Sequence, residues 1–341
     1  MVSAFGGLQE AYLHHLADLL HEPQFRNSPR GFASQERLGV RFTLHDPLRR
    51  VITHPGRRSN LVFNFAEALW YLAGRDDLAY LAYYAPGVAK YSADGQRLTG
   101  TAYGPRIFDH GDGAGDQWAA VTAAIREDPD TKRAVIQIFQ PRELLVAGNP
   151  DVACTLALQF LLREGRMHMV AFMRANDAYR GMASDVFSFT LLQEMMARQF
   201  KVPVGSYTHV AGSLHLYQPD VGKAARLLDD PAPAEPAEDR MPAMPDGDNR
   251  AHLDRVLKIE ESLRLGRERL GVDDVEALDL PPWWADVVRL FELYRRARAG
   301  QPDHDGLADR MPPLYRRLLR QRFPVLASHA PSAEEVFDAA P

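Results

Sequence analysis

Apolar residues recur at helical spacing in several parts of the chain. Leu8, Tyr12 and Leu16 lie on one face of a helix, which predicts an amphipathic helix over residues 8–21. The same pattern predicts a buried helix over 60–73 with Asn60 as its cap, a helix over 117–127 and the most apolar helix over 186–200.

Short apolar and β-branched runs predict strands. They lie at 38–44, 134–139, 154–162 and 166–174, and two more are expected within 204–217. A turn at 163–165 joins the third and fourth runs. Residues 75–116 are rich in Gly, Asp and Tyr, and we expect an irregular segment that forms part of a site. The chain up to about residue 220 therefore predicts an α/β (α+β) fold, with a mixed sheet packed against helices.

The composition changes at Asp229, which predicts the domain boundaries. Residues 229–249 contain five prolines and seven acidic residues, typical of a solvated linker or loop. Residues 1–228 would form the first domain. Residues 250–341 are expected to be an added, arginine-rich helical region, either a charged cover or an element that closes over a partner or substrate.

Composition narrows the class of protein. The 341 residues are 46% hydrophobic and 25% charged, as in a folded globule. No apolar stretch is long enough to span a membrane, and residues 1–19 do not resemble a secretory signal, so we expect a cytoplasmic protein. A net charge of −5 favours neither nucleic acid nor an anionic membrane as a partner. A phosphate group would therefore be held by a few local arginines.

The single cysteine, Cys154, excludes an internal disulfide and a multi-cysteine metal site. It follows a turn and opens a predicted strand, where a side chain can project into a cleft. It is either a small buried hydrophobic residue or a nucleophile. A nucleophilic thiol needs cations that lower its pKa, and Arg30, Arg133 and Arg174 are the candidates.

Two carboxyl groups lie in otherwise apolar segments. Glu67 lies inside a predicted buried helix, where desolvation would raise its pKa and suit it to acid–base chemistry, unless it faces solvent. Asp185 precedes the most apolar helix and is placed like an N-terminal cap. The pair His14-His15 has no third ligand at a suitable spacing, so we expect no metal site.

Eight motifs occur in the order and at the spacing of a known family. They are SPRG (28–31), EALWYLAG (67–74), YGPR (103–106), DPDTKR (128–133), Cys154 ahead of a strand, RANDAYRG (174–181), FTLLQEMMARQ (189–199) and HLY (215–217). Together they resemble the thymidylate synthase superfamily over about residues 5–220. The resemblance does not extend to 221–341.

This resemblance implies a reaction in which a cysteine adds to C6 of a pyrimidine nucleotide. C5 then takes a one-carbon unit from 5,10-methylenetetrahydrofolate, without a metal. In the resemblance, Cys154 matches the nucleophile, Glu67 the general acid–base group and Tyr103 the tyrosine beside the nucleophile. Asp177, Gly181 and Glu67 match residues on the folate side. His215 and Tyr217 match the ligands of the sugar hydroxyl, and Arg30 and Arg174 match ligands of the phosphate. Lys132 and Arg133 match phosphate ligands that the other subunit of a homodimer supplies.

One departure from the family concerns the base. Thymidylate synthases have asparagine where this chain has Asp185. Uracil presents an N3–H donor and an O4 acceptor, whereas cytosine presents an N3 acceptor and an N4 amino donor. The same aspartate occurs in the deoxycytidylate hydroxymethylases of the family. The resemblance therefore implies a cytosine base and a catalytic, base-binding Asp185, unless this residue only caps a helix.

A second departure concerns the product. Methyl-forming members carry tryptophans ahead of the YG motif that shield the exocyclic methylene group from water, and residues 90–95 contain none. Water addition would give a hydroxymethyl product and tetrahydrofolate.

A third departure concerns the sugar. An arginine and a serine of the family's phosphate site are Lys132 and Ala175 here, which loosens the contacts to phosphate and favours a ribonucleotide. This pattern is similar to the CMP 5-hydroxymethylases of nucleoside-antibiotic (mildiomycin-type) biosynthesis. The alternatives are dCMP hydroxymethylation, thymidylate synthesis and a non-catalytic nucleotide-binding protein.

Overall fold

The computed structural model describes residues 3–108, 115–230 and 239–327. The chain divides into two compact units. The first unit comprises the described residues of 1–57 and 63–249, and the second those of 58–62 and 250–341.

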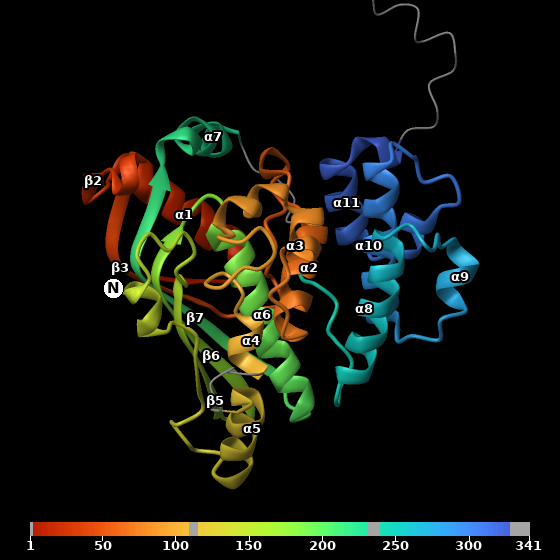
Figure 1. Ribbon diagram of the computed structural model, residues 1–341, viewed down its shortest axis with the longest axis horizontal. Helices are drawn as coiled ribbons and strands as arrows, with labels where there is room; N and C mark the ends of the chain where they lie inside the picture. The colour runs from red at the N-terminus through yellow and green to blue at the C-terminus, as the bar shows by residue number, and fades with distance from the viewer. Residues whose placement is uncertain (1–2, 109–114, 231–238, 328–341) are drawn as a thin grey trace, which may run out of the picture. The chain divides into compact units, whose positions relative to one another are not determined.

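A mixed sheet forms the centre of the first unit (Figure 1). Its strands are β1 (Ser3–Phe5), β2 (Phe25–Asn27), β3 (Ser34–Leu44), β4 (Val135–Gln137), β5 (Thr155–Arg163), β6 (Arg166–Asp177) and β7 (Val204–Tyr217). Among the described residues these seven strands run in the order β1-β3-β7-β6-β5-β4, and β2 pairs with β3. The pairs β1–β3 and β6–β7 are parallel and the others antiparallel. The predicted mixed α/β fold is confirmed.

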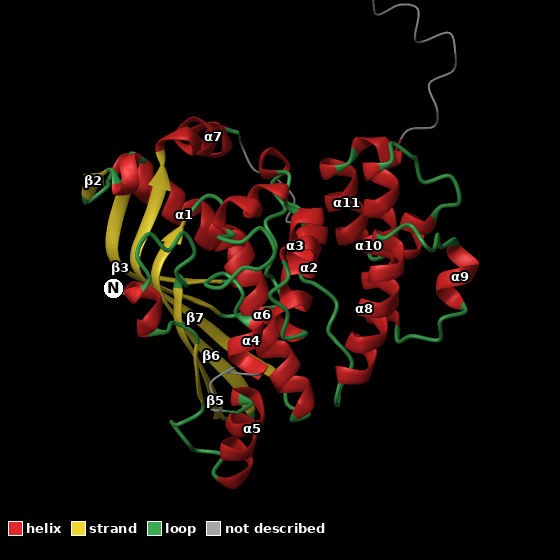
Figure 2. Cartoon of the chain, viewed as in Figure 1, coloured by secondary structure: helices red, strands yellow, loops and turns green. Residues whose placement is uncertain are grey.

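Helices supply the rest of the first unit (Figure 2). They are α1 (Leu8–His21), α2 (Leu61–Leu72), α3 (Leu78–Tyr84), α4 (Gly104–Phe108), α5 (Gln117–Glu127), α6 (Gly181–Gln199) and α7 (Gln218–Asp229). Helix α6 packs on β6 and β7, and α1 contacts both α6 and β3. The bounds of α1 and α5 agree with the prediction because both helices have regular amphipathic spacing.

Two strand predictions were wrong in extent. Residues 204–217 form one strand rather than two, and β3 begins at Ser34 rather than at residue 38. The polar residues Thr208 and His209 interrupt the apolar pattern of β7, but His209 is completely buried and hydrogen-bonded. A buried polar residue with partners does not end a strand.

Two segments are more helical than predicted. Helix α6 begins at Gly181, five residues before the predicted start, because its first turns carry polar residues that a hydrophobic pattern does not detect. Residues 75–116 were expected to be irregular, yet α3 and α4 lie within them. The carboxylate of Asp77 caps α3 by accepting a hydrogen bond from the Tyr80 amide at 3.3 Å. Residues 109–114 lie outside the described residues.

Residues 239–249 form a loop that is packed rather than solvated. Met241 and Met244 are 1% and 2% exposed. The Met241 amide donates to the Leu48 carbonyl at 2.9 Å, and the Met244 amide donates to the Glu194 carboxylate at 2.7 Å. The proline and acidic content predicted a solvated loop, but the two buried methionines pack residues 239–249 against the rest of the unit. Residues 231–238 of the predicted linker lie outside the described residues.

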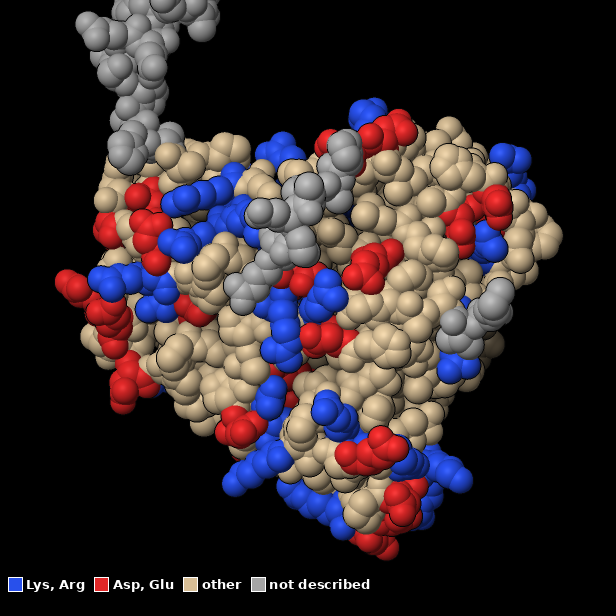
Figure 3. Space-filling view, turned by 180° about the vertical axis from the view of Figure 1, so that it is seen from behind, with Lys and Arg blue, Asp and Glu red and all other residues tan. Residues whose placement is uncertain are grey.

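The second unit is helical. Its helices are α8 (Arg250–Arg264), α9 (Val272–Glu276), α10 (Pro282–Arg298) and α11 (Pro313–Arg322). Pro281 and Pro282 stand at the start of α10, where proline is favoured because the first helical N–H groups have no partner within the helix. In the part of the chain that the structure describes, no helix is long and apolar enough to cross a membrane. Basic and acidic side chains are interspersed on the face that Figure 3 shows.

Candidate active site

The register of the sheet brings the predicted site residues to one end of three strands. Cys154 directly precedes β5, where Thr155 pairs with Met173 near the end of β6. Further along β6, Asp177 pairs with His215 near the end of β7. Cys154 and His215, which are 61 positions apart in sequence, therefore lie at the same end of the sheet.

Arg174 fixes the turn that carries Cys154. Its Nε donates to the Ala153 carbonyl at 2.8 Å and its Nη2 to the Val152 carbonyl at 2.9 Å. Its backbone amide donates to the Cys154 carbonyl at 2.8 Å. Three donors of one residue thus hold the backbone on both sides of the thiol, and the guanidinium remains exposed.

Two buried carboxylates that sequence reasoning missed support the same turn. Glu143 accepts from the Ala153 amide at 2.7 Å and pairs with Arg106 at 2.5 Å. Asp151 accepts from the amides of Gly100 and Thr101, both at 2.8 Å. In the sequence, the only sign of this role was that each acid lies near the lone cysteine. Acidic residues in loops are ordinarily solvated, so the sequence did not indicate that these two are buried.

The expected lowering of the Cys154 pKa is wrong. Arg174 and Arg30 do lower it, but burial is the largest cause and Asp185 and Asp151 act in the same direction, so the pKa is raised. The sequence showed the cations but not the protein atoms that surround the thiol, although Cys154 keeps an intermediate exposure. Cys154 is therefore a thiol at neutral pH.

Glu67 lies on α2 and is 7% exposed, so it does not face solvent. Burial, followed by the nearby charge of Asp185, raises its pKa to about 8. Ser188 Oγ donates to Glu67 Oε2 at 3.4 Å. Tyr103 is 4% exposed, and burial, followed by the charges of Asp185 and Cys154, raises its pKa. The thiol, the two acids and the phenol thus share one region.

Asp185 does not cap α6, because the helix begins at Gly181 and Asp185 lies one turn inside it. Burial raises its pKa to about 7, and a hydrogen bond from Asn176 opposes that rise. Asn176 Nδ2 donates to Asp185 Oδ2 at 2.7 Å. A carboxyl group in this position can change its ionisation near neutral pH.

The remaining predicted ligands lie at the same end of the sheet. His215 and Tyr217 are in contact on β7, with ring centroids 4.8 Å apart. Burial raises the pKa of Tyr217 and of Cys154, and Arg30 is close enough to both to oppose that rise. Asp177 Oδ1 accepts from the amides of residues 179 and 180, both at 2.9 Å. Ala175 is half-buried on β6.

Lys132 and Arg133 do not join this group within the chain. Both are exposed just before β4, and Gln159 Nε2 donates to the Lys132 carbonyl at 2.9 Å. Because β4 and β5 are antiparallel, the two cations lie near the far end of β5. Eight residues of strand separate that end from Cys154, which corresponds to about 25 Å.

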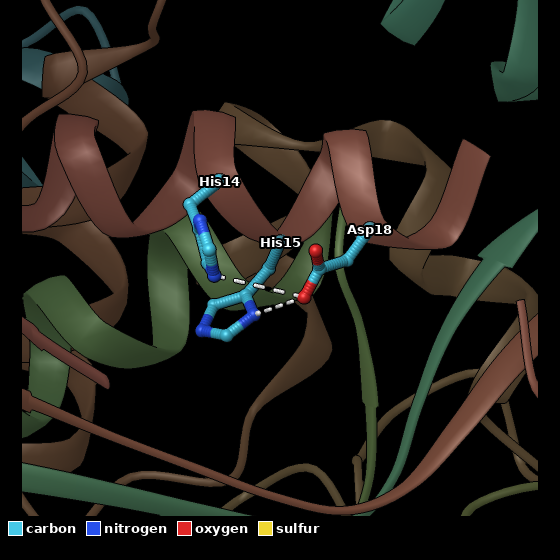
Figure 4. Close-up of side chains that lie close together, drawn as sticks. All are labelled: His14, His15 and Asp18. Carbon is cyan, nitrogen blue, oxygen red and sulfur yellow. Dashed lines mark ion pairs between the residues drawn. The ribbon is translucent and has the colours of Figure 1, made fainter. Parts of the chain in front are cut away.

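The histidine pair gains a third potential ligand that the sequence analysis overlooked. Figure 4 shows His14, His15 and Asp18 on α1, with Asp18 Oδ2 lying 3.6 Å from His14 Nε2 and 3.8 Å from His15 Nδ1. Arg37 Nη1 lies 3.7 Å from the same oxygen. Burial lowers the pKa of His15 to about 4, so this imidazole is neutral and Arg37 balances the carboxylate. We describe the cluster as an ion pair flanked by histidines.

Comparison with known proteins identifies the fold. The family model described as thymidylate synthase matches residues 10–241. The chain belongs to the thymidylate synthase family. The site and the strands β2 to β7 lie within the matched region, whereas β1 and the helices α8 to α11 of the second unit lie outside it.

Three phage proteins named deoxyuridylate hydroxymethyltransferase are similar to this chain. The protein of Bacillus phage SP01 is 33% identical over 213 residues, 60% of this chain and 55% of the relative. That of Pseudomonas phage M6 is 30% identical over 220 residues, 62% of each chain. That of Delftia phage PhiW-14 is 29% identical over 191 residues, 52% of each. The matched stretch thus spans little more than half of each relative.

Proposed function

We propose that this member of the thymidylate synthase family transfers a one-carbon unit to C5 of cytidine monophosphate. Water adds to that unit, giving 5-hydroxymethyl-CMP and tetrahydrofolate. The family match and the hydroxymethyltransferase names of the three relatives support the reaction class. The observation that carries the choice of base is Asp185, which lies inside α6 beside Cys154 and Glu67.

The ionised form of Asp185 favours cytosine. A carboxylate only accepts hydrogen bonds, and cytosine offers the N4 amino group as a donor where uracil offers the O4 acceptor. Two acceptors facing each other in a buried site would leave both without a donor, which costs roughly 1–3 kcal/mol. Because the helix begins at Gly181, Asp185 is free from the capping role that would compete with base contact.

Cys154 acts as the nucleophile in this proposal. Its sulfur forms a bond to C6, and the electron pair of the C5–C6 double bond moves to C5, which attacks the one-carbon unit. Arg174 and Arg30 favour the thiolate that must form first. C5 then loses its proton while the bond between the transferred carbon and the folate nitrogen breaks, so that tetrahydrofolate leaves and an exocyclic methylene group remains. Water adds to this group, the S–C6 bond breaks and the C5–C6 double bond returns.

Methylenetetrahydrofolate, when bound, supplies the carbon at the oxidation level of formaldehyde. The residues present fit such a co-substrate. Asp177 uses Oδ1 for two backbone amides, which leaves Oδ2 to accept from N–H groups of a pterin. Gly181 adds no side chain beside it. Glu67, which burial keeps protonated at neutral pH, holds the added water and exchanges protons with it.

The segment that carries shielding tryptophans in methyl-forming members has Tyr91 in this chain. Tyr91 lies close enough to Arg180 and Tyr217 to influence their pKa values, so the segment borders the site. Residues 90–95 contain no tryptophan. The lack of tryptophan in this segment supports hydroxymethyl formation over reduction to a methyl group.

The ribose and the dimer complete the proposal. Ala175 offers no hydroxyl group to the phosphate and Lys132 offers a point charge in place of a planar guanidinium, which leaves freedom for a 2′-hydroxyl. Lys132 and Arg133 would reach the phosphate of the other subunit in a homodimer, and their distance from Cys154 within the chain supports this arrangement. The same two substitutions are the basis for placing the enzyme in nucleoside-antibiotic biosynthesis.

A second candidate is hydroxymethylation of dUMP. The names of the three relatives favour dUMP. A third possible substrate, dCMP, shares its base with CMP and its sugar with dUMP. Asp185 favours cytosine over the uracil of those names.

Replacing Asp185 tests the choice of base. Asp185→Asn should shift the preference in a mixture of CMP and UMP from cytosine toward uracil by at least about tenfold, because an amide can donate to O4 and accept from N3–H. Products are identified by mass spectrometry after incubation with methylenetetrahydrofolate.

The matched control is Asp286→Asn in the second unit. Burial raises the pKa of Asp286 to about 6, so this change also removes a buried acid that titrates near neutrality. Its base preference should equal that of the wild type. An unchanged preference in Asp185→Asn, or a wild type that prefers uridine nucleotides, contradicts the proposed cytosine contact.

A further inference from the structure

Three polar side chains form a continuous chain of hydrogen bonds behind Asp185. Asn176 donates to Asp185 Oδ2 at 2.7 Å, and Asn176 Oδ1 lies 3.1 Å from His209 Nε2. His209 Nδ1 in turn lies 2.9 Å from the hydroxyl of Tyr207. Asn176 is 3% exposed, and His209 and Tyr207 are completely buried. We call Asn176, His209 and Tyr207 the Asp185 relay.

The chemistry of these groups fixes the direction of the relay. An amide oxygen can only accept, so His209 Nε2 must carry its proton and donate to Asn176. The other ring nitrogen then has a lone pair, which accepts from the Tyr207 hydroxyl. Burial lowers the pKa of His209 to about 3, so the imidazole is neutral at the pH values of interest. Every donor in the relay thus points toward Asp185.

Packing holds the relay in place. Phe42 stacks on His209 with ring centroids 5.0 Å apart and an interplanar angle of 22°. A Cβ atom at Gly181 would lie 3.2 Å from Asn176 Nδ2 and 3.3 Å from Asp185 Oδ2, so a side chain there would press on this hydrogen bond. Leaving one buried relay group without its partner costs roughly 1–3 kcal/mol, so the relay behaves as a unit.

We propose that Asn176, held by His209 and Tyr207, is a positioning residue that keeps Asp185 Oδ2 as an acceptor and leaves Oδ1 to meet the base. The preference for cytosine over uracil then depends on Asn176, a residue that does not itself touch the base. This inference rests on the proposed function, because it concerns the base contact of the same site.

The relay also determines which oxygen of Asp185 can carry a proton, and therefore what the carboxyl group offers to the base. With Oδ2 taken by an N–H donor, a bound proton must lie on Oδ1. The ionised form accepts from the N4 amino group of cytosine. The protonated form can donate to N3 of cytosine or to O4 of uracil, so it discriminates less between the two bases.

The groups around Asp185 do not stabilise its ionised form, so the N–H group of Asn176 is important for it. The titratable groups that interact with it are Glu67 from α2, Tyr71, Tyr103, Cys154 ahead of β5, Asp177 at the end of β6, and Tyr207 from β7. All are neutral or negative, so none of them favours the carboxylate. The N–H group of Asn176 does favour it, and removing that donor should raise the pKa of Asp185.

The decisive variant is Asn176→Asp. The new side chain has nearly the same shape and can still accept from His209, but it presents an acceptor to Asp185. We expect the ratio of kcat/KM for CMP over UMP at pH 7 to fall by about tenfold or more. The pH at which this ratio rises should increase by one pH unit or more. Both nucleotides compete in one tube, so loss of folded enzyme cancels from the ratio.

Asn27→Asp is the matched control. Asn27 Nδ2 donates to the Glu36 carboxylate, also at 2.7 Å, but on the exposed strand β2. The same amide-to-carboxylate change there should leave the ratio and its pH dependence unchanged. Tyr207→Phe, which removes only the outermost donor, should shift the ratio in the direction of Asn176→Asp by a smaller amount.

Binding separates failure of this inference from failure of the proposed function. Kd values for CMP and UMP, measured by calorimetry across pH 6 to 9, report base preference without turnover. A wild type that converts neither nucleotide contradicts the proposed function, and the Kd ratio still tests the relay. A Kd ratio and a pH dependence that are the same in Asn176→Asp and in the wild type would overturn the inference.

Discussion

Cys154, Glu67 and Asp185 lie beside one another at the end of the sheet, and burial is the largest cause of the raised pKa in all three. After burial, the charge of Asp185 adds to the raised pKa of Glu67, because a second carboxylate close by disfavours ionisation. At neutral pH Glu67 therefore holds a proton that it would lose in water, and Asp185 gains and loses its proton in the same pH range. Such a pair of acids beside a thiol suits proton exchange with a bound substrate.

Glu67→Gln should make folding stability less dependent on pH. The folded-state pKa of Glu67 is raised from 4.5 to about 8, so the folded protein binds this proton more strongly than the unfolded chain. The stability that Glu67 contributes is therefore present below about pH 4.5 and falls as the pH rises toward 8. The free energy of unfolding of the variant, relative to that of the wild type, should therefore increase as the pH rises across this window, by on the order of a few kcal/mol.

Urea unfolding at pH 5, 7 and 9 measures this difference. The control is Glu127→Gln at the exposed end of α5, for which we expect a constant difference from wild type. A difference between Glu67→Gln and wild type that does not grow from pH 5 to pH 9 would show that Glu67 is not buried as a proton-holding acid.

Helices with regular apolar spacing were predicted with correct bounds, whereas helices and strands with polar residues inside the fold were not. Helix α1 agrees with the prediction over Leu8–His21 because its apolar spacing is regular. The first turns of α6 and the centre of β7 were misjudged because their polar residues have hydrogen-bond partners inside the fold, as Asp185 and His209 do. Partners that lie far away in sequence leave no local signal. Motif order could place the site residues, but Asn176 as a support for Asp185 required the sheet register.

At the scale of the whole molecule, the first unit exposes apolar residues on its sheet strands. Leu38, Val135 and Leu156 are 51%, 40% and 38% exposed. Exposed apolar residues on strands are expected where another subunit covers them. Together with the position of Lys132 and Arg133 far from Cys154, they support the proposed homodimer in which each subunit completes its partner's phosphate site.

Subunit complementation tests this arrangement. Protomers with Lys132→Ala and Arg133→Ala are co-expressed with Cys154→Ala protomers under a second affinity tag, and the hybrid dimer is purified. Each parent dimer should be nearly inactive. The hybrid should regain about half of wild-type activity, because one of its two sites has both an intact thiol and intact cations. An inactive hybrid would show that the cations act within their own subunit or not at all.

We propose that the enzyme hydroxymethylates cytosine in a ribonucleotide. The most direct test of this proposal is a mixture of CMP, dCMP, UMP and dUMP at equal concentration, incubated with wild-type enzyme and methylenetetrahydrofolate. Mass spectrometry follows each nucleotide, and absorbance follows the folate. We predict that CMP gains one CH2O unit first and that no dihydrofolate forms. A CH2O gain on dUMP first, or a methyl gain on dUMP with dihydrofolate, would contradict the account.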